Sequence, residues 1–256
     1  MSAPQSQPSS ASGQPSLELQ TDFWNRWNTE AREKLPIDPV SLRRAAFVLE
    51  RLQRLLPPGG RPEILEIGCG TGWLCEQLGA FGSVTGIDLA DAVIQRARVR
   101  MPHARFLAGD FATVPFSPAS FDVVVTLETI AHVIDQRAFV ARIHDLLRPD
   151  GILLLTTQNR FVMERRSDVM RQQPGQLRDW LTMRRVRALV RPYFEILEAT
   201  TLVPAGDRGV LRIVGSYKLN RLAQMFVAEA TIARWKERLG LGQTLVLAAR
   251  KLAPQG

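Results

Sequence analysis

The sequence predicts an α/β fold with a doubly wound, seven-stranded and mostly parallel sheet. From residue 61 onward, short apolar runs alternate with amphipathic helical stretches. That alternation is typical of parallel βαβ units. A glycine-rich turn joins the first apolar run to the first of these helices, as in sheets that bind a ligand at their carboxyl edge. The length of 256 residues suits one such domain with insertions.

Bulk composition narrows the class of protein. Hydrophobic residues make up 45% and charged residues 23% of the chain, as in ordinary globular proteins, and no run of about 18 apolar residues predicts a membrane span. Residues 1–20 lack the basic start and apolar core of a secretory signal, and their Ser, Pro, Gln and Gly content predicts a disordered tail. The two cysteines, Cys69 and Cys75, fit neither a zinc site nor a disulfide framework, so we expect a cytoplasmic protein.

The domain organisation follows from the pattern along the chain. We expect a helical N-terminal cap over 21–60 and the α/β domain over 61–256, with insertions at about 160–181 and 204–240. Apolar runs predict the first five strands at 63–67, 84–87, 104–107, 122–126 and 152–156, with helices over 73–78, 90–100 and 136–147 between them.

The last third of the chain has a different rhythm. Thr182 is expected to cap a helix, and the stretches FEILEATTLV and QTLVLAARK are expected to form strands six and seven. The long insertion between these two strands is expected to lie above the carboxyl edge of the sheet. Together with the other insertion and the N-terminal cap, it would form the acceptor pocket.

Positive charge is concentrated in one segment. The net charge is +8, and residues 160–191 hold nine arginines against three acidic residues. Such a segment favours an acidic substrate, an anionic membrane surface or nucleic acid, although a solvated helical face accounts for it equally well.

The glycine loop LEIGCGTG is not a standard nucleotide motif. Gly68 permits a tight turn after the first strand, and Gly70 and Gly72 let a ligand approach the main chain. The dinucleotide fingerprint requires a glycine where this chain has Trp73, and no lysine followed by serine or threonine completes a P-loop.

Acidic residues follow the next two strands. Asp88 ends the second strand, where a carboxylate accepts hydrogen bonds from ribose hydroxyls, and Asp110 with Phe111 ends the third. An acid there can accept from an adenine amino group while the apolar neighbour packs on the ring. Glycine loop, ribose acid and adenine acid therefore occur in order on three successive strands.

The motifs LEIGCGTG, GIDLA, GDF, FDVVVTLETIAHVID and LLRPDGILLLTT resemble those of class I S-adenosylmethionine-dependent methyltransferases, which have a Rossmann-like fold. FWNRWN, DPVSLRR, LETIAHV and TTQNR are most similar to the O-methyltransferases of ubiquinone biosynthesis. The resemblance implies S-adenosyl-L-methionine as the cofactor.

The resemblance also implies a role for each matching residue. Gly68 and Gly70 would lie against the methionine part, Glu66 would reach its amino group, and the Leu127 carbonyl would accept from the same ammonium. Asp88 would hold the ribose. Asp110 and Phe111 would hold the adenine, and Arg43 would reach the carboxylate.

The sequence contains fewer signals for the residues that would contact the methyl acceptor. His132, just beyond the fourth strand, is the candidate general base, because an imidazole suits proton abstraction near neutral pH. The quinone family has two acids and a histidine here as a metal site. Ala131 replaces the second acid, so we expect no metal. The candidate substrate contacts are Trp24, Trp27, Trp180 and Tyr217.

We therefore expect an enzyme that methylates a hydroxyl or an amine of a small-molecule or lipid-like acceptor. One alternative is an RNA or protein methyltransferase that uses residues 160–191 as its basic footprint. Another is a non-catalytic protein that binds S-adenosylmethionine. The sequence does not specify the oligomeric state.

Overall fold

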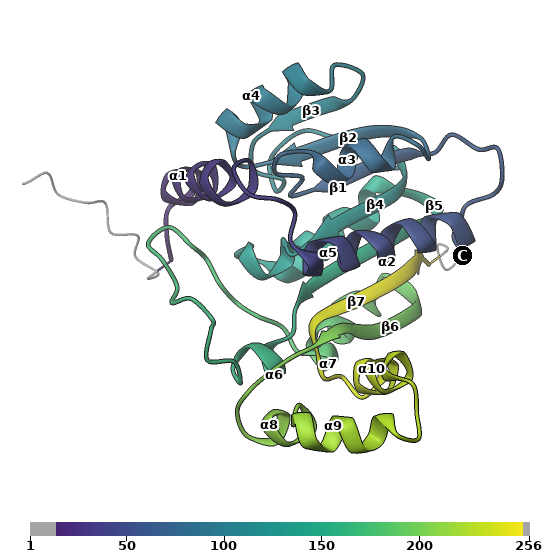
Figure 1. Cartoon of the computed structure of the whole chain (residues 1–256). Coiled ribbons are helices and arrows are strands. Elements are labelled where there is room, and N and C mark those ends of the chain that lie inside the picture. Colours follow the sequence, from purple (N-terminus) through teal and green to yellow (C-terminus); the bar gives the residue numbers. More distant parts are fainter. Residues whose placement is uncertain (1–13, 253–256) are drawn as a thin grey trace, which may run out of the picture.

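The structure is a computed structural model that describes residues 14–252. Seven strands form one sheet in the order β3-β2-β1-β4-β5-β7-β6 (Figure 1). β7 pairs antiparallel with both β5 and β6, and the other pairs are parallel. The predicted doubly wound, mostly parallel sheet is confirmed. The strands are β1 (Glu63–Ile67), β2 (Ser83–Asp88), β3 (Arg105–Ala108), β4 (Phe121–Leu127), β5 (Leu147–Gln158), β6 (Phe194–Pro204) and β7 (Gly242–Lys251).

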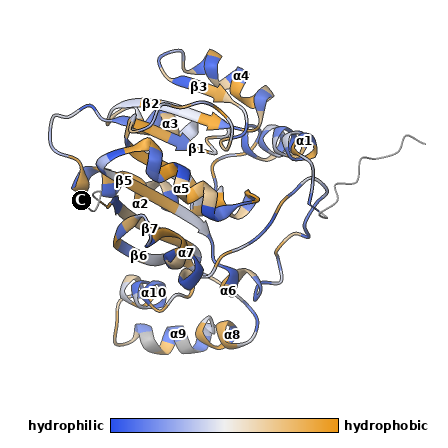
Figure 2. Cartoon of the chain, turned by 180° about the vertical axis from the view of Figure 1, so that it is seen from behind, coloured by the Kyte–Doolittle hydropathy of each residue, from blue (hydrophilic) through white to orange (hydrophobic). Residues whose placement is uncertain are grey.

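Helices cover both faces of this sheet, as the alternating pattern predicts. On one face α2 (Pro39–Leu55), α3 (Trp73–Leu78) and α4 (Asp91–Arg100) pack their apolar side chains against the strands. On the other face α5 (Gln136–Leu146) and α7 (Met183–Val190) do the same. Apolar residues consequently line the strands between the two helical layers (Figure 2). This burial is the main stabilising contribution to the domain.

The N-terminal region differs from the prediction at one boundary. Ser16 caps α1 (Leu17–Trp27) by accepting a hydrogen bond from the Leu19 amide. The expected tail over 1–20 is therefore wrong for residues 17–20, because the cap and a buried Phe23 stabilise a helix there. Residues 1–13 of that expected tail lie outside the described residues. The π-helix η1 (Asn28–Arg32) continues α1 toward α2.

The last insertion also differs from expectation. Its helices are α8 (Val210–Val214), α9 (Tyr217–Gln224) and α10 (Glu229–Arg238). They follow the carboxyl end of β6, but α10 packs back against that strand, and the three helices lie beyond the β6 edge (Figure 1). The insertion therefore does not extend over the centre of the carboxyl edge.

Two short helical elements flank the centre of that edge. They are η2 (Ile130–His132) after β4 and α6 (Arg160–Met163) after β5. An irregular stretch, here called the covering segment (residues 164–182), then leads to α7. In the part of the chain that the structure describes, no helix combines the length and apolarity needed to cross a bilayer.

Candidate functional site

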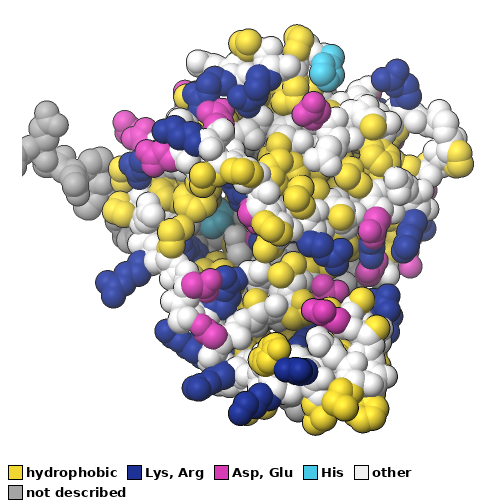
Figure 3. All heavy atoms as spheres, in the orientation of Figure 1, with side chains coloured by type: hydrophobic (Ala, Val, Ile, Leu, Met, Phe, Trp, Pro, Cys, Tyr) yellow, Lys and Arg dark blue, Asp and Glu magenta, His cyan; other side chains and the backbone are white. Residues whose placement is uncertain are grey.

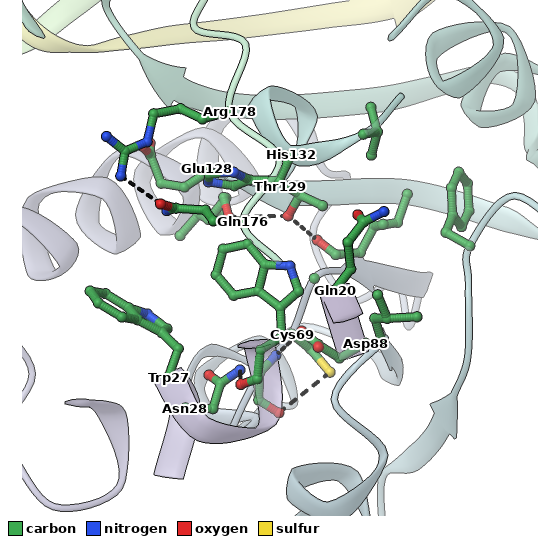
Figure 4. Close-up of a pocket in the computed structure, with 18 of the residues that line it drawn as sticks. Gln20, Trp27, Asn28, Cys69, Asp88, Glu128, Thr129, His132, Gln176 and Arg178 are labelled. Carbon is green, nitrogen blue, oxygen red and sulfur yellow. Dashed lines mark hydrogen bonds between the residues drawn. The ribbon is translucent and has the colours of Figure 1, made fainter. Parts of the chain in front are cut away.

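A cavity of about 800 Å³ opens at the carboxyl ends of β1, β2 and β4. Its lining comes from α1, η1, α2, the glycine loop, the ends of these strands and the covering segment (Figure 4). Segments more than 100 residues apart in the sequence therefore meet at one place. This is the position at which doubly wound sheets bind their ligands.

The glycine loop forms one wall of the cavity. Gly68, with φ +76°, directs the chain out of β1, and a Cβ there would lie 2.0 Å from the Thr129 hydroxyl oxygen. Gly70, with φ +52°, faces η1, where a Cβ would lie 2.8 Å from the Asn28 amide oxygen. Both positions require glycine for backbone conformation and for space.

Gly68→Ala is expected to lower the free energy of unfolding more than the matched change Gly59→Ala. Gly59 has the same backbone conformation, φ +77°, but no atom lies within 4 Å of its added Cβ. The control therefore measures the left-handed strain alone, about 1–2 kcal/mol, and Gly68→Ala adds about 1–3 kcal/mol of overpacking against Thr129. Urea unfolding of both variants measures the difference. Equal losses would contradict the close packing of the loop.

Asp88 connects the second strand to the loop. One carboxylate oxygen accepts a hydrogen bond from the Gly70 amide at 2.7 Å, and the other accepts from the Ala90 amide at 2.8 Å. Burial raises the pKa of this carboxyl, although both amide bonds favour the charged form. Each oxygen retains a further lone pair, so the carboxylate can also accept from a ligand in the cavity.

Glu66 lies deeper, at the end of β1. It is 3% exposed, and the Cys75 thiol donates to its carboxylate at 2.9 Å. Burial raises its pKa to about 8. Both Cys69 and Cys75 are free and buried beside it. A buried acid with so few polar partners is well placed to gain from a cationic ligand.

The third strand contributes the predicted adenine side. Asp110 and Phe111 line the cavity directly after β3. The Phe111 ring is nearly buried and packs edge to face on Phe139, with ring centroids 5.2 Å apart. The Arg142 guanidinium lies 5.3 Å from the Phe111 ring centroid and donates to the Val114 carbonyl. This end of the cavity therefore combines an apolar ring with one acidic and one basic side chain.

The structure places Arg44, and not the predicted Arg43, in the cavity lining. The Arg43 side chain is 54% exposed and points toward Glu237, 3.8 Å away. Arg44 lines the cavity and forms a 3.1 Å ion pair with Glu128. The buried apolar residues of α2 fix its rotation, and this rotation turns Arg44 rather than Arg43 toward the sheet edge.

Glu128 was not among the predicted site residues. Its backbone has φ +60°, an uncommon conformation for a residue with a side chain. The carboxylate binds Arg44 and accepts from Thr156 through one oxygen, and the second oxygen is buried with no hydrogen-bond partner among the described residues. Leu127, just before it, also lines the cavity, and its carbonyl accepts from the Thr129 hydroxyl at 3.2 Å.

His132 has a defined orientation at the cavity wall. Its Nδ1 lies 2.6 Å from the Leu177 carbonyl oxygen, and Trp24 packs on the ring with centroids 4.8 Å apart. A carbonyl only accepts, so Nδ1 carries the proton. Burial is the main cause that lowers the pKa of His132 to about 4; the nearby Arg178 charge acts in the same direction, and the bond to Leu177 opposes this shift. The imidazole is thus neutral at physiological pH, with an unprotonated Nε2.

Three of the four predicted aromatic contacts meet at the cavity. Trp24 and Trp27 come from α1 and Trp180 from the covering segment. Tyr217 does not belong to this group: it is 74% exposed on α9, because the last insertion packs on β6 instead of over the edge. None of the side chains of 204–240 that the structure describes lines the cavity, which corrects the expected pocket.

Several lining residues were missed by sequence reasoning. Asn28, Thr129, Gln176 and Arg178 all line the cavity (Figure 4). Thr129 could have been found from its place directly after β4. Gln176 and Arg178 lie in the covering segment, which has no regular strand or helix pattern to place them. Asn28 lies in η1, within the predicted helical cap, but a helical pattern alone does not tell which of its polar side chains faces a ligand.

Comparison with known proteins agrees with the geometry. The methyltransferase domain family matches residues 65–155, which run from β1 to β5. The chain carries a class I S-adenosylmethionine-dependent methyltransferase domain. The seven-stranded sheet of this domain is the Rossmann-like fold of these methyltransferases. S-adenosylmethionine is the cofactor of this superfamily.

Individual relatives share only part of their length with this methyltransferase domain. A probable S-adenosylmethionine-dependent methyltransferase of Mycolicibacterium smegmatis is 36% identical over 42% of this chain and 42% of the relative. A ubiquinone biosynthesis O-methyltransferase of Saccharophagus degradans is 33% identical over 52% of this chain and 57% of the relative. The chain thus spans about half the length of the curated relatives it matches.

A solved structure gives the same fold over most of the chain. The N-methyltransferase NodS of Bradyrhizobium japonicum, in complex with S-adenosyl-L-homocysteine, has a TM-score of 0.59 at 17% identity, covering 91% of this chain and 99% of NodS. At this identity the likeness concerns the fold.

The residues of the cavity fit S-adenosylmethionine. That molecule presents an ammonium, two ribose hydroxyls and an adenine amino group, all of which donate hydrogen bonds. The methyltransferase domain presents the acceptors Glu66, Asp88 and Asp110 on successive strands at one cavity. Across the described residues, no group of three His, Cys, Asp or Glu side chains could hold a metal ion.

Proposed function

We propose that this protein is an enzyme that transfers a methyl group from S-adenosylmethionine to a hydroxyl or amine of a small-molecule or lipid-like acceptor in the cytoplasm. The observation that carries the proposal is the neutral His132, fixed by Leu177 at the wall of the cavity that holds Asp88 and the glycine loop. A base and a cofactor site share one cavity, which is the arrangement that methylation of a protonated nucleophile requires.

Each group has a role in the proposed reaction. When bound, S-adenosylmethionine supplies an activated methyl on sulfur. Asp88 would hold the ribose and Glu66 the ammonium, while Asp110 and Phe111 would contact the adenine. These contacts would align the methyl with the acceptor, and alignment alone contributes roughly 7–11 kcal/mol. His132 Nε2 would accept the proton of the acceptor hydroxyl or amine.

Two features support a small acceptor over a nucleic acid. Three arginines of residues 160–191 are compensated within the chain, because Arg160, Arg166 and Arg185 pair with Glu164, Asp168 and Asp179. Arg166 and Arg178 line the cavity itself. Less of the segment's charge is therefore available to a phosphate backbone.

Calorimetry and a turnover assay test the proposal together. In the calorimetric titration, S-adenosyl-L-homocysteine is expected to bind. In the turnover assay, the protein is expected to convert S-adenosylmethionine to S-adenosyl-L-homocysteine when a hydroxyl- or amine-bearing acceptor from a chemical panel is present. Binding without release for any acceptor would favour a non-catalytic binding protein. Affinity for RNA that falls steeply with salt, with RNA as the only methylated acceptor, would favour the nucleic-acid alternative.

With a hydroxyl acceptor, whose own protonation state does not change in this range, the turnover rate is expected to stay constant as the pH falls from 7 to about 5 and to decline near pH 4. The base must be neutral, and burial lowers the pKa of His132 to about 4. An ordinary histidine would become protonated near pH 6.5 and would lose activity there. Rates measured within seconds of a pH jump separate this titration from acid unfolding. A midpoint near 6.5 would contradict a buried base.

A further inference from the structure

Hydrogen bonds hold the backbone of the covering segment on both sides of Arg178. The residue before it, Leu177, accepts from His132 through its carbonyl. The residue after it is Asp179. The Asp179 amide donates to the Ala131 carbonyl at 2.8 Å, and the Asp179 carbonyl accepts from the Gln136 side chain at 3.0 Å. The backbone on both sides of Arg178 is therefore bonded to the turn that carries His132. The position of its side chain relative to the base is fixed by these contacts.

The Arg178 guanidinium is held by neutral groups only. It donates to the Met170 carbonyl at 2.8 Å and to the Gln176 side chain at 2.7 Å, and it lies 5.1 Å from the Trp180 ring centroid. A guanidinium has five N–H donors, so these bonds leave three without an acceptor among the described residues. Partial burial lowers the pKa of this group, which reflects a cation without a counter-charge.

Three of the other four arginines that line the cavity have an acidic partner. Arg32, Arg44 and Arg166 pair with Asp38, Glu128 and Asp168. Arg142 has no acidic partner either among the described residues, but it lies at the Phe111 end of the cavity, where it packs on that ring and donates to the Val114 carbonyl. Arg178 differs from these arginines because it has no acidic partner in the described part of the chain and lies on the side of His132, away from Asp88 (Figure 4). Figure 3 shows further Lys and Arg side chains over α6 and α8, at the lower left of the view.

We infer that the methyl acceptor carries a carboxylate, which the Arg178 guanidinium binds next to His132. A planar, stacked guanidinium with free N–H groups matches a carboxylate in two parallel hydrogen bonds. The aromatic wall formed by Trp24 and Trp180 would contact the apolar body of the same molecule. The acceptor class is thus a small acid, in which a hydroxyl or amine reaches His132 while the carboxylate reaches Arg178.

This inference rests on the proposed function for the site, because it assigns the anionic group to the acceptor. The carboxylate of the cofactor is the competing ligand for Arg178. The two differ in a measurable way: a cofactor contact would make the affinity for S-adenosyl-L-homocysteine depend on Arg178, whereas an acceptor contact would not.

Binding of simple probes to the protein saturated with S-adenosyl-L-homocysteine tests the assignment. Benzoate, neutral benzamide and inorganic phosphate are titrated by NMR, against the wild type, Arg178→Gln and Arg171→Gln. Arg171 belongs to the same segment, is exposed and lies outside the cavity lining, so it controls for loss of one charge. Benzoate is expected to bind the wild type and the control about 10- to 100-fold more tightly than benzamide, and Arg178→Gln is expected to remove this preference.

Each other result overturns the inference. These results are equal affinity for benzoate and benzamide, no binding of benzoate, tighter binding of phosphate than of benzoate, or weaker cofactor binding in Arg178→Gln. Failure of the proposed function gives a different result: benzoate would bind through Arg178, but no acceptor would be methylated. If methylation occurs only with neutral acceptors and Arg178→Gln leaves their KM unchanged, the proposed function stands and the inference fails.

Discussion

Replacing His132 with alanine is expected to lower turnover by about 10²- to 10⁴-fold and to leave the affinity for S-adenosyl-L-homocysteine nearly unchanged. The imidazole is neutral, its Nδ1 is bonded to the Leu177 carbonyl, and Nε2 is the nitrogen that remains to take a proton. Loss of this group removes the proton acceptor without changing the carboxylates at the strand ends. Single-turnover rates with a saturating acceptor measure the effect.

His103→Ala is the matched control for that variant. His103 lies in the exposed turn before β3, outside the cavity lining, so its removal is expected to leave the rate unchanged. Because Trp24 packs on the His132 ring, a change in cofactor affinity in His132→Ala would indicate collapse of the wall. Full turnover in a folded His132→Ala protein would show that the base is another residue or that none is needed.

Replacing Asp88 with alanine is expected to weaken cofactor binding by about 1–3 kcal/mol, which is about 5- to 150-fold. The ribose hydroxyls would lose their acceptor. The Gly70 amide would also lose its 2.7 Å bond, so the loop that faces the methionine part would be held less firmly. Calorimetry with S-adenosyl-L-homocysteine measures the affinity.

Two further variants identify the origin of that loss. Asp91→Ala removes an exposed acid three residues later, which bonds to Asn25 outside the cavity, and is expected to keep wild-type affinity. Asp88→Asn keeps the size but offers one acceptor in place of two, so an intermediate affinity is expected. Unchanged binding in folded Asp88→Ala would contradict the ribose assignment.

The sequence predicted the central sheet closely because its signals are local. β1 and α3 have the predicted bounds, since the apolar run over 63–67 ends at Gly68 and Gly72 starts the helix. Thr182 caps α7 as expected, because its hydroxyl accepts from the Arg185 amide. Backbone preferences of glycine and threonine act within a few residues, and one sequence is enough to read them.

The errors concern choices that depend on tertiary packing. Arg43 and Arg44 are adjacent in the sequence, and only the rotation of α2 against the sheet determines which of them enters the cavity. The apolar residues of 204–240 fit equally well over the cavity or against β6, so Tyr217 was assigned to the wrong place. The role of each cofactor and substrate residue stays a prediction.

The neighbours of His132 were out of reach for another reason. Leu177 lies 45 residues away from it in a stretch without regular structure, and no periodic pattern places that carbonyl beside an imidazole. Arg178 follows it, and nothing in the sequence distinguishes it from the other eight arginines of residues 160–191. Contacts made by irregular segments depend on where both ends are anchored, which is a property of the whole fold.

The bond between His132 and Leu177 connects the covering segment to the proposed base. If residues 164–182 swing outward to admit a molecule, the imidazole loses the partner that fixes its tautomer. Proton abstraction by His132 would then become efficient only after the covering segment closes over the cavity again. Under the proposed function, methyl transfer would thus depend on the covering segment being in place over the bound acceptor.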